Sequence, residues 1–309
     1  MRVVPVRHYG QWIVTVVMLV LAALLVQSLL TNPRFQWNIV FGYFLNGQIL
    51  KGLGTTIALT VIAMVVGVVI GVVMALGRES RNPVVAAAAS LYVGFFRGTP
   101  LLVQLIFWFN LGVLFQNITI GVPFGPTLFS IETNDLITPL TAALLGLGLN
   151  EGAYMSEVVR GGVLSVDGGQ IEAARALGMS KGKTLRVVVL PQALRIIIPP
   201  TGNELIGLLK TTSLASVISF TELVGASSRI YSANLKVLEL LVVVSIWYLA
   251  ITSVLSVGQY YLERRLAAGS GLQSAPTLGQ VIRDGILGRR ARSLRGSAHN
   301  NPGTGEEQR

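Results

Sequence analysis

Six long apolar stretches alternate with shorter polar segments along the chain. Most of them are about 20 residues long, which is the length of helix that crosses the hydrocarbon core of a bilayer. We therefore expect an all-α integral membrane protein with about six transmembrane helices. The six stretches are residues 12–30, 55–76, 84–115, 137–157, 201–220 and 238–261.

The third stretch is too long for one simple span. As a straight helix it would reach about 48 Å, well beyond the thickness of the apolar core. The sequence Arg97-Gly98-Thr99-Pro100 interrupts it. Glycine and proline both favour a bend or break in a helix, so we predict a break at residues 97–100.

The distribution of Lys and Arg predicts the orientation, because these residues concentrate in cytoplasmic segments. With the N-terminus inside, 18 of the 24 Lys and Arg residues fall in cytoplasmic segments and four in external loops. Both termini are then cytoplasmic, and so is the segment 159–195. The four external cations are Arg34, Lys51, Arg229 and Lys236, and Arg97 and Lys210 remain at membrane depth.

The two ends of the chain differ from its body. The first stretch has a basic start like that of a secretory signal peptide, but no small-x-small cleavage site follows it, so we favour a retained helix and keep cleavage as the alternative. Residues 263–309 are rich in Arg, Gly and Ser without periodicity, which is typical of a disordered cytoplasmic tail. The predicted organisation is an N-terminal part (1–51), a core (52–262) and a basic tail (263–309).

Composition supports a multi-pass protein of the cell membrane. The chain is 52% hydrophobic and 12% charged, with a mean hydropathy of +0.65. A net charge of +10 is also typical of proteins that bind nucleic acid, but the positive residues are distributed along this chain as in a membrane protein. We therefore expect contact with membrane lipid and not with nucleic acid. There is no cysteine, and the two histidines, His8 and His299, lie near the ends. We therefore expect no metal site, no catalytic residues and no enzymatic activity.

The cytoplasmic segment 159–195 has a net charge of +4 and a helical pattern. The run "IEAARALG" favours a helix that Gly178 ends, and "KGKTLRVVVL" favours a second short helix that ends at Pro191. The expected helix-turn-helix hairpin could insert into a groove on a soluble partner. "GMSKGKT" is one glycine short of a phosphate-binding loop, because Leu177 stands where the first Gly should be. We therefore expect no ATP binding by this chain.

Glu172-Ala173-Ala174, then Gly178 and Val188-x-Leu190-Pro191, resemble the EAA loop of binding-protein-dependent ABC transporter permeases. Valine stands where the family usually has isoleucine. The blocks "FFRGTPLLVQL", "LNEGAYMSEVVRGG", "LPQALRIIIPPTGNELIGLLKTTSLASVIS" and "ELVG" narrow the resemblance to the permeases of polar amino acids such as histidine, glutamine, arginine and glutamate. The resemblance covers residues from about Gly52 to Leu262.

This resemblance implies a five-helix permease core preceded by one extra helix, and a pathway between two permease subunits, identical or related. It also implies two cytoplasmic ATPase subunits, which bind ATP and Mg, and an external solute-binding protein. The EAA loop would couple ATPase motion to alternating access of the pathway for a polar L-amino acid. The coupling residues implied are Glu172, Ala173, Ala174, Gly178, Leu190 and Pro191.

Ionisable residues inside membrane spans usually face a bundle interior or a watery cavity. Glu157 and Arg160 are three residues apart, so we expect an ion pair between them. Glu151 has no such neighbour, and we favour a pairing with Arg97 or Lys210 on another helix over contact with a cationic substrate. Gly67 and Gly71 form a small-xxx-small pattern that predicts close helix packing.

The fifth stretch is the most polar, so we expect it to line the pathway or a subunit interface. Its Ser and Thr side chains could bind a substrate carboxylate, although bonds to their own backbone are the commoner use. The translocation-pathway candidates are Arg97, Gln104, Asn150, Glu151, Tyr154, Asn203, Glu204, Lys210, Thr211, Ser213 and Ser216.

Two other functions are weighed against an ATP-driven importer. An ion-coupled secondary transporter needs no ATPase and often has inverted repeats, which we do not find here. A membrane enzyme is disfavoured because no HExxH motif is present and no histidine lies in the body of the chain. The permease subunit of an importer is therefore the leading hypothesis, with the secondary transporter as its alternative.

Overall fold

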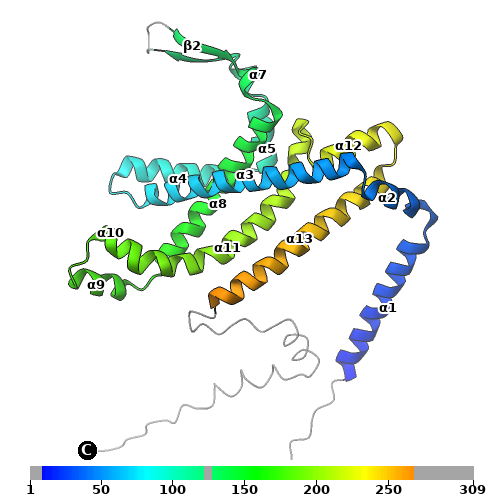
Figure 1. Cartoon of the computed structure of the whole chain (residues 1–309), viewed down its shortest axis with the longest axis horizontal. Helices are drawn as coiled ribbons and strands as arrows, with labels where there is room; N and C mark the ends of the chain where they lie inside the picture. The colour runs from blue at the N-terminus through cyan, green and yellow to red at the C-terminus, as the bar shows by residue number, and fades with distance from the viewer. Residues whose placement is uncertain (1–8, 122–126, 268–309) are drawn as a thin grey trace, which may run out of the picture. The chain divides into compact units, whose positions relative to one another are not determined.

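The computed structural model describes residues 9–121 and 127–267, and these residues are mostly helical (Figure 1). The expected all-α membrane fold is therefore confirmed. The described residues up to Gln259 form one compact unit, and those from Tyr260 to Ala267 belong to a second. The elements are α1 (Tyr9–Thr31), η1 (Pro33–Phe35), α2 (Trp37–Phe44), α3 (Gly47–Arg78), α4 (Pro83–Gly98), α5 (Leu101–Phe109), α6 (Leu111–Leu114), β1 (Asn117–Gly121), β2 (Thr127–Glu132), α7 (Thr133–Leu136), α8 (Pro139–Leu164), α9 (Gly168–Ala176), α10 (Lys181–Thr184), η2 (Leu185–Val189), α11 (Leu190–Thr211), η3 (Thr212–Ile218), α12 (Leu223–Asn234) and α13 (Val237–Ala267).

The structure has fewer helices that clearly qualify as membrane spans than the apolar pattern predicts. Among the described helices, α1, α3 and α13 are long and apolar enough to cross a membrane, and the bent pair α4–α5 would make a fourth span. All six apolar stretches are largely helical, but α8 and α11 do not meet the same criterion. The reason is visible in their sequences, which hold glycines, prolines and charged residues that lower the mean hydropathy of each helix.

The packing of α3 against α8 forms the centre of the compact unit (Figure 1). Gly67 of α3 lies against Glu151, and Gly71 lies against Met155. A Cβ atom at Gly71 would stand only 2.5 Å from the Cβ of Met155. Only glycine permits such close backbones, so the prediction of helix packing from the small-xxx-small pattern is confirmed.

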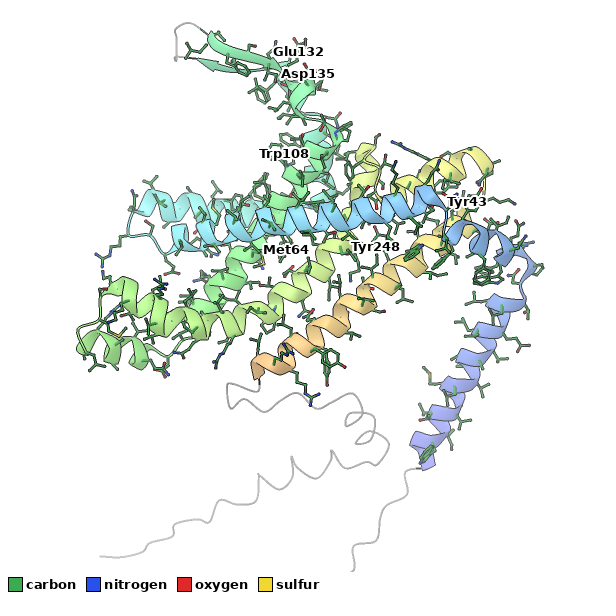
Figure 2. The ribbon with its side chains drawn as sticks, viewed as in Figure 1. Tyr43, Met64, Trp108, Glu132, Asp135 and Tyr248 are labelled. Carbon is green, nitrogen blue, oxygen red and sulfur yellow. The ribbon has the colours of Figure 1, made fainter. Side chains whose placement is uncertain are left out.

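The main hydrophobic core lies where α3, α5, α8 and η3 meet. Met64, labelled in Figure 2, belongs to it together with residues from each of these helices. A second cluster joins α2, α12 and α13 around Val40 and Leu223. The buried members of the first core are Leu59, Ala63, Met64, Leu105, Ile137, Ala142, Ala143, Leu147, Met155, Leu208, Ala215 and Ile218.

The predicted break in the third apolar stretch is confirmed. Helix α4 ends at Gly98 and α5 begins at Leu101, and their axes differ by 103°. The side chain of Gln104 closes the bend, because its Nε2 donates to the hydroxyl of Thr99 at 2.7 Å and to the carbonyl of Phe96 at 3.0 Å. The backbone groups freed by the break are therefore partly satisfied within the protein.

The connection between α6 and α7 contains a β-hairpin that the apolar pattern did not predict. Strands β1 and β2 pair antiparallel, with Asn117 opposite Glu132 and Ile118 opposite Ile131. Residues 117–132 fall between the third and fourth apolar stretches, a segment for which no element was predicted. Glu132 of the hairpin and Asp135 of α7 are labelled in Figure 2.

The predicted end of a short helix at Pro191 is wrong. The backbone is helical without interruption from Lys181 to Ile218. Residues Leu185–Val189 form a π-helical turn, in which the amide of Leu190 donates to the carbonyl of Leu185. Such a wide turn accommodates Pro191 at the start of α11, where a missing N–H costs little.

The predicted boundaries of the core fall inside helices. Helix α3 begins at Gly47, five residues before Gly52, and α13 continues to Ala267, five residues beyond Leu262. The rest of the predicted tail, residues 268–309, lies outside the described residues.

Candidate functional site

The hairpin formed by α9 and α10 has well-defined caps. Asp167 accepts a hydrogen bond from the amide of Gly169 at 2.6 Å and starts α9. Gly178 ends it in the left-handed conformation, with φ of +77°. The amide of Gly178 donates to the carbonyl of Arg175, and that of Met179 donates to Ala174. This pattern is a Schellman motif, so the predicted helix end at Gly178 is confirmed.

The second arm of the hairpin is fixed to the membrane helices. Ser180 caps α10, and a cluster of Val166, Val189, Ala193 and Ile197 packs against residues near the end of α8. In addition, Gln192 donates to the side chain of Gln170 at 2.6 Å and so joins α11 to α9. The hairpin is therefore held on the helix bundle by an apolar cluster and by side-chain bonds.

The residues of the EAA pattern divide into an inner and an outer set. Ala174 is buried, whereas Glu172, Ala173 and Gly178 are exposed. In the described part of the chain the side chain of Glu172 has no hydrogen bond or ion pair. Leu177 is 84% exposed, on the side that the charge distribution predicts to be cytoplasmic. Leu190 is half-exposed and Pro191 is exposed at the start of α11.

A cluster of charged side chains joins the ends of α3, α4 and α8. Glu157 contacts Arg78 at 2.9 Å and Arg97 at 3.1 Å, and it contacts Arg160 at 3.6 Å on its own helix. The expected pair of Glu157 and Arg160 is confirmed. Arg160 also reaches Glu79 at 3.6 Å. The local pair therefore belongs to a network that ties three helices together.

The favoured pairing of Glu151 with Arg97 or Lys210 is wrong. Arg97 instead contacts Glu157 and lies over the ring of Tyr154, 5.3 Å from its centre. Lys210 is exposed and forms no ion pair with any described carboxylate. Sequence spacing cannot reveal this outcome, because the geometry of α4 and α8 decides which carboxylate Arg97 reaches.

Glu151 is a buried carboxyl group in the contact between α3 and α8. It is only 5% exposed, and its Oε1 has no hydrogen-bond partner among the described residues. Glu204 of α11 lies close enough to interact with it electrostatically and also interacts with Arg97. Three predicted pathway residues, Arg97, Glu151 and Glu204, are thus brought into one region, together with Tyr154.

The remaining pathway candidates have mainly structural contacts. Asn150 donates to the carbonyl of Phe96 at 2.9 Å and to Gln104 at 3.2 Å, so both amides hold the α4–α5 bend against α8. Ser and Thr side chains of α11 and η3 donate to backbone carbonyls of their own helix, as the commoner interpretation expected. These are Thr211, Ser213 and Ser216, whereas Asn203 is exposed on α11.

One buried polar centre was not predicted from the sequence. Glu222, fully buried at the start of α12, accepts hydrogen bonds from the amides of Val224 and Gly225 at 2.9 and 2.8 Å. The hydroxyl of Tyr248 on α13 donates to it at 3.1 Å, and Thr56 of α3 lies 3.3 Å away. The position of Glu222 before an apolar run signals a helix cap, but the partners from α3 and α13 have no local signal.

Together these features define a multi-pass membrane protein with a polar interior region and an exposed helical hairpin, the organisation of a transport subunit. The family model described as "Binding-protein-dependent transport system inner membrane component" matches residues 67–268. The chain belongs to this family, and within it to the permeases of the polar amino-acid group of ABC importers.

Individual relatives agree with this assignment. The chain is 45% identical over 268 residues to the arginine transport system permease protein ArgU of Corynebacterium glutamicum, covering 86% of this chain and 83% of that protein. It is 35% identical over 235 residues to the glutamine transport system permease protein GlnP of Escherichia coli, covering 75% and 98%.

Solved structures show the same fold. A crystal structure of an amino acid ABC transporter with histidines matches with a TM-score of 0.61 and 34% identity, over 71% of this chain and 94% of that one. The MetNI methionine ABC transporter in an inward-facing conformation matches with a TM-score of 0.53 and 19% identity, over 71% of this chain and 95% of that one. The alternative of an ion-coupled secondary transporter finds no support in these comparisons.

Proposed function

We propose that this chain is one of two permease subunits, identical or related, of an ATP-driven importer of polar L-amino acids. Two cytoplasmic ATPase subunits bind ATP and Mg²⁺, and an external solute-binding protein delivers the amino acid. The family assignment supports an ATPase and a binding protein as partners. The number of subunits is the one that the resemblance to binding-protein-dependent permeases implies.

The observation that carries the proposal is the exposed face of the α9–α10 hairpin. Leu177 and Glu172 face outward without partners in the described chain, while Ala174 and the cluster around Val189 anchor the hairpin to α8 and α11. An exposed apolar side chain beside an unpaired carboxylate, on a short and well-capped helix, suits insertion into a groove of another protein. Among the coupling residues, we assign contact with the partner to the exposed Glu172, Ala173, Gly178, Leu190 and Pro191, and positioning of α9 to the buried Ala174.

Reconstitution tests the coupling. The permease is co-expressed with the ATPase and inserted into nanodiscs, and ATP hydrolysis is measured with and without the substrate-loaded binding protein. We expect stimulated hydrolysis for the wild type and its loss for Glu172→Arg, with the thermal midpoint unchanged because Glu172 is exposed. Glu132→Arg, a matched charge reversal at an exposed position of the β-hairpin, keeps the ATPase bound. Absence of any stimulation in the wild type refutes the proposed function.

The carboxyl groups of Glu151 and Glu204 favour a substrate with a cationic side chain. A buried carboxyl oxygen without a partner is costly in a membrane protein, and a guanidinium or ammonium group would satisfy it. One relative is named for arginine transport, and one solved structure contains histidines. Alternating access would expose these residues to each side of the membrane in turn.

Competition between substrates tests this preference. Uptake of L-arginine and of L-glutamine is compared in proteoliposomes that contain the complete transporter. If the natural binding protein binds only one of these amino acids, a second binding protein delivers the other. We expect Glu151→Gln to lower arginine uptake about tenfold relative to glutamine uptake, since one hydrogen-bonded charge pair is worth about 1.5 kcal/mol. An equal loss for both amino acids would mean that Glu151 serves only the packing of α3 against α8.

A further inference from the structure

An open cavity lies between the start of α3 and the end of α12, away from the region of Glu151. Its volume is about 890 Å³. Two cations, Lys51 and Arg229, line it, and most of the other lining side chains are uncharged and polar. Lys51 lies near the start of α3 and Arg229 in the middle of α12, both in segments that the charge distribution predicts to be external. The uncharged lining residues are Tyr43, Asn46, Gly47, Gln48, Ile230, Ala233 and Asn234.

The two cations lack a counter-ion. Lys51 and Arg229 are both exposed, and neither forms an ion pair or side-chain hydrogen bond with another residue in the described ranges. No carboxylate lines the cavity. The ion pairs of the cluster around Glu157 involve neither of these two cations. The cavity therefore presents uncompensated positive charge to the solvent.

The walls of the cavity are held in place by bonds between elements. Asn234 of α12 donates to the hydroxyl of Tyr43 on α2 at 3.1 Å, and its Oδ1 accepts from the amide of Lys236 at 2.9 Å. Lys236 in turn donates to the side chain of Gln36 at 2.8 Å. A recognition surface fixed in this way loses little conformational entropy when a ligand binds.

We propose that this cavity, defined by Lys51 and Arg229, is a docking site for acidic side chains of the external solute-binding protein. The inference rests on the proposed function, which requires such a partner. Carboxylates complement two free cations, while the amides and Tyr43 can bind neighbouring polar groups. The external position that the charge distribution predicts for both cations is also the side on which a solute-binding protein would dock.

Charge-reversal variants test the site. The complete transporter with its ATPase is placed in nanodiscs of neutral phosphatidylcholine, and ATP hydrolysis is titrated with the loaded cognate binding protein. For Lys51→Glu/Arg229→Glu we expect the half-saturating concentration of binding protein to rise about tenfold or more, with the maximal rate unchanged. Arg34→Glu serves as the matched control, because Arg34 is an exposed cation on the same predicted side but does not line the cavity.

Changes in salt concentration and in lipid composition distinguish the carboxylates of the binding protein from lipid phosphates as partners of the two cations. Raising the ionic strength from about 0.05 to 0.3 M should weaken association for the wild type, whose attraction is screened, but not for the double variant, in which salt screens a repulsion instead. An unchanged half-saturating concentration in the double variant overturns the proposal, even if stimulation itself confirms the importer. So does an effect that appears only in nanodiscs with phosphatidylglycerol, which would assign the cations to lipid phosphates.

Discussion

The contact of Gly71 with α8 predicts the effect of a single methyl group. In Gly71→Ala the new Cβ would lie 2.5 Å from the Cβ of Met155 and 2.9 Å from the backbone nitrogen of Ser156. Backbone atoms cannot rotate away as a side chain can. Since carbon atoms in contact are normally at least about 3.5 Å apart, α3 and α8 must separate by roughly 1 Å near this point.

The loss of stability in Gly71→Ala is best measured against the same substitution at a second glycine of α3. Gly54 is also inside α3, but a Cβ there would meet no atom within 4 Å. Both replacements gain the same helix propensity, about 1 kcal/mol, so this term cancels in their difference. What remains is overpacking, which lowers the free energy of unfolding by about 1–3 kcal/mol. We therefore expect Gly71→Ala to be less stable than Gly54→Ala by this amount.

Equilibrium unfolding of the purified chain in mixed micelles, followed by circular dichroism, measures the difference. Transport should fall in parallel, because Glu151 lies at the same helix contact, one turn from Met155. If Gly71→Ala and Gly54→Ala unfold at the same denaturant concentration, the close approach of α3 and α8 does not exist as described and the reasoning fails.

Two further predictions concern buried and half-buried carboxylates. Glu157→Gln removes the carboxylate that three arginines share, so it should lower the free energy of unfolding by about 1–2 kcal/mol in chemical denaturation. Glu79→Gln loses only one exposed contact and should change the free energy of unfolding by less than about 0.5 kcal/mol. Glu222→Gln should cost about 2–4 kcal/mol, because two amides and a hydroxyl lose a charged acceptor inside the protein, and Tyr248→Phe only about 1 kcal/mol. Equal losses for the two members of either pair would contradict these assignments.

Much of the fold could be predicted from local signals. The bend at residues 97–100 follows from Gly98 and Pro100, and the end of α9 follows from Gly178. The close contact of α3 with α8 follows from the spacing of Gly67 and Gly71. In each case the residue that causes the structure lies at the place where the structure occurs.

The features that were missed depend on residues far apart in the chain. Arg97 could reach Glu151 or Glu157, and only the bend of α4 against α8 decides between them. The helix through Pro191 depends on a π-helical turn that has no clear sequence signature. The β-hairpin is short and exposed, so its polar–apolar alternation is weak. Predicting these features would require the tertiary contacts that they help to form.

The uninterrupted helical backbone from Lys181 to Ile218 has a mechanical consequence. It joins the exposed α9–α10 hairpin directly to Glu204, over roughly 35 Å of helix axis. A flexible linker in that interval would dissipate movement before it arrived, whereas a rod transmits it as tilt or twist about its own axis. Regular α-helical hydrogen bonding is broken at two places along this helix, the wide turn at Leu185–Val189 and the pair Pro199 and Pro200 inside α11, so any bending should concentrate at these two places.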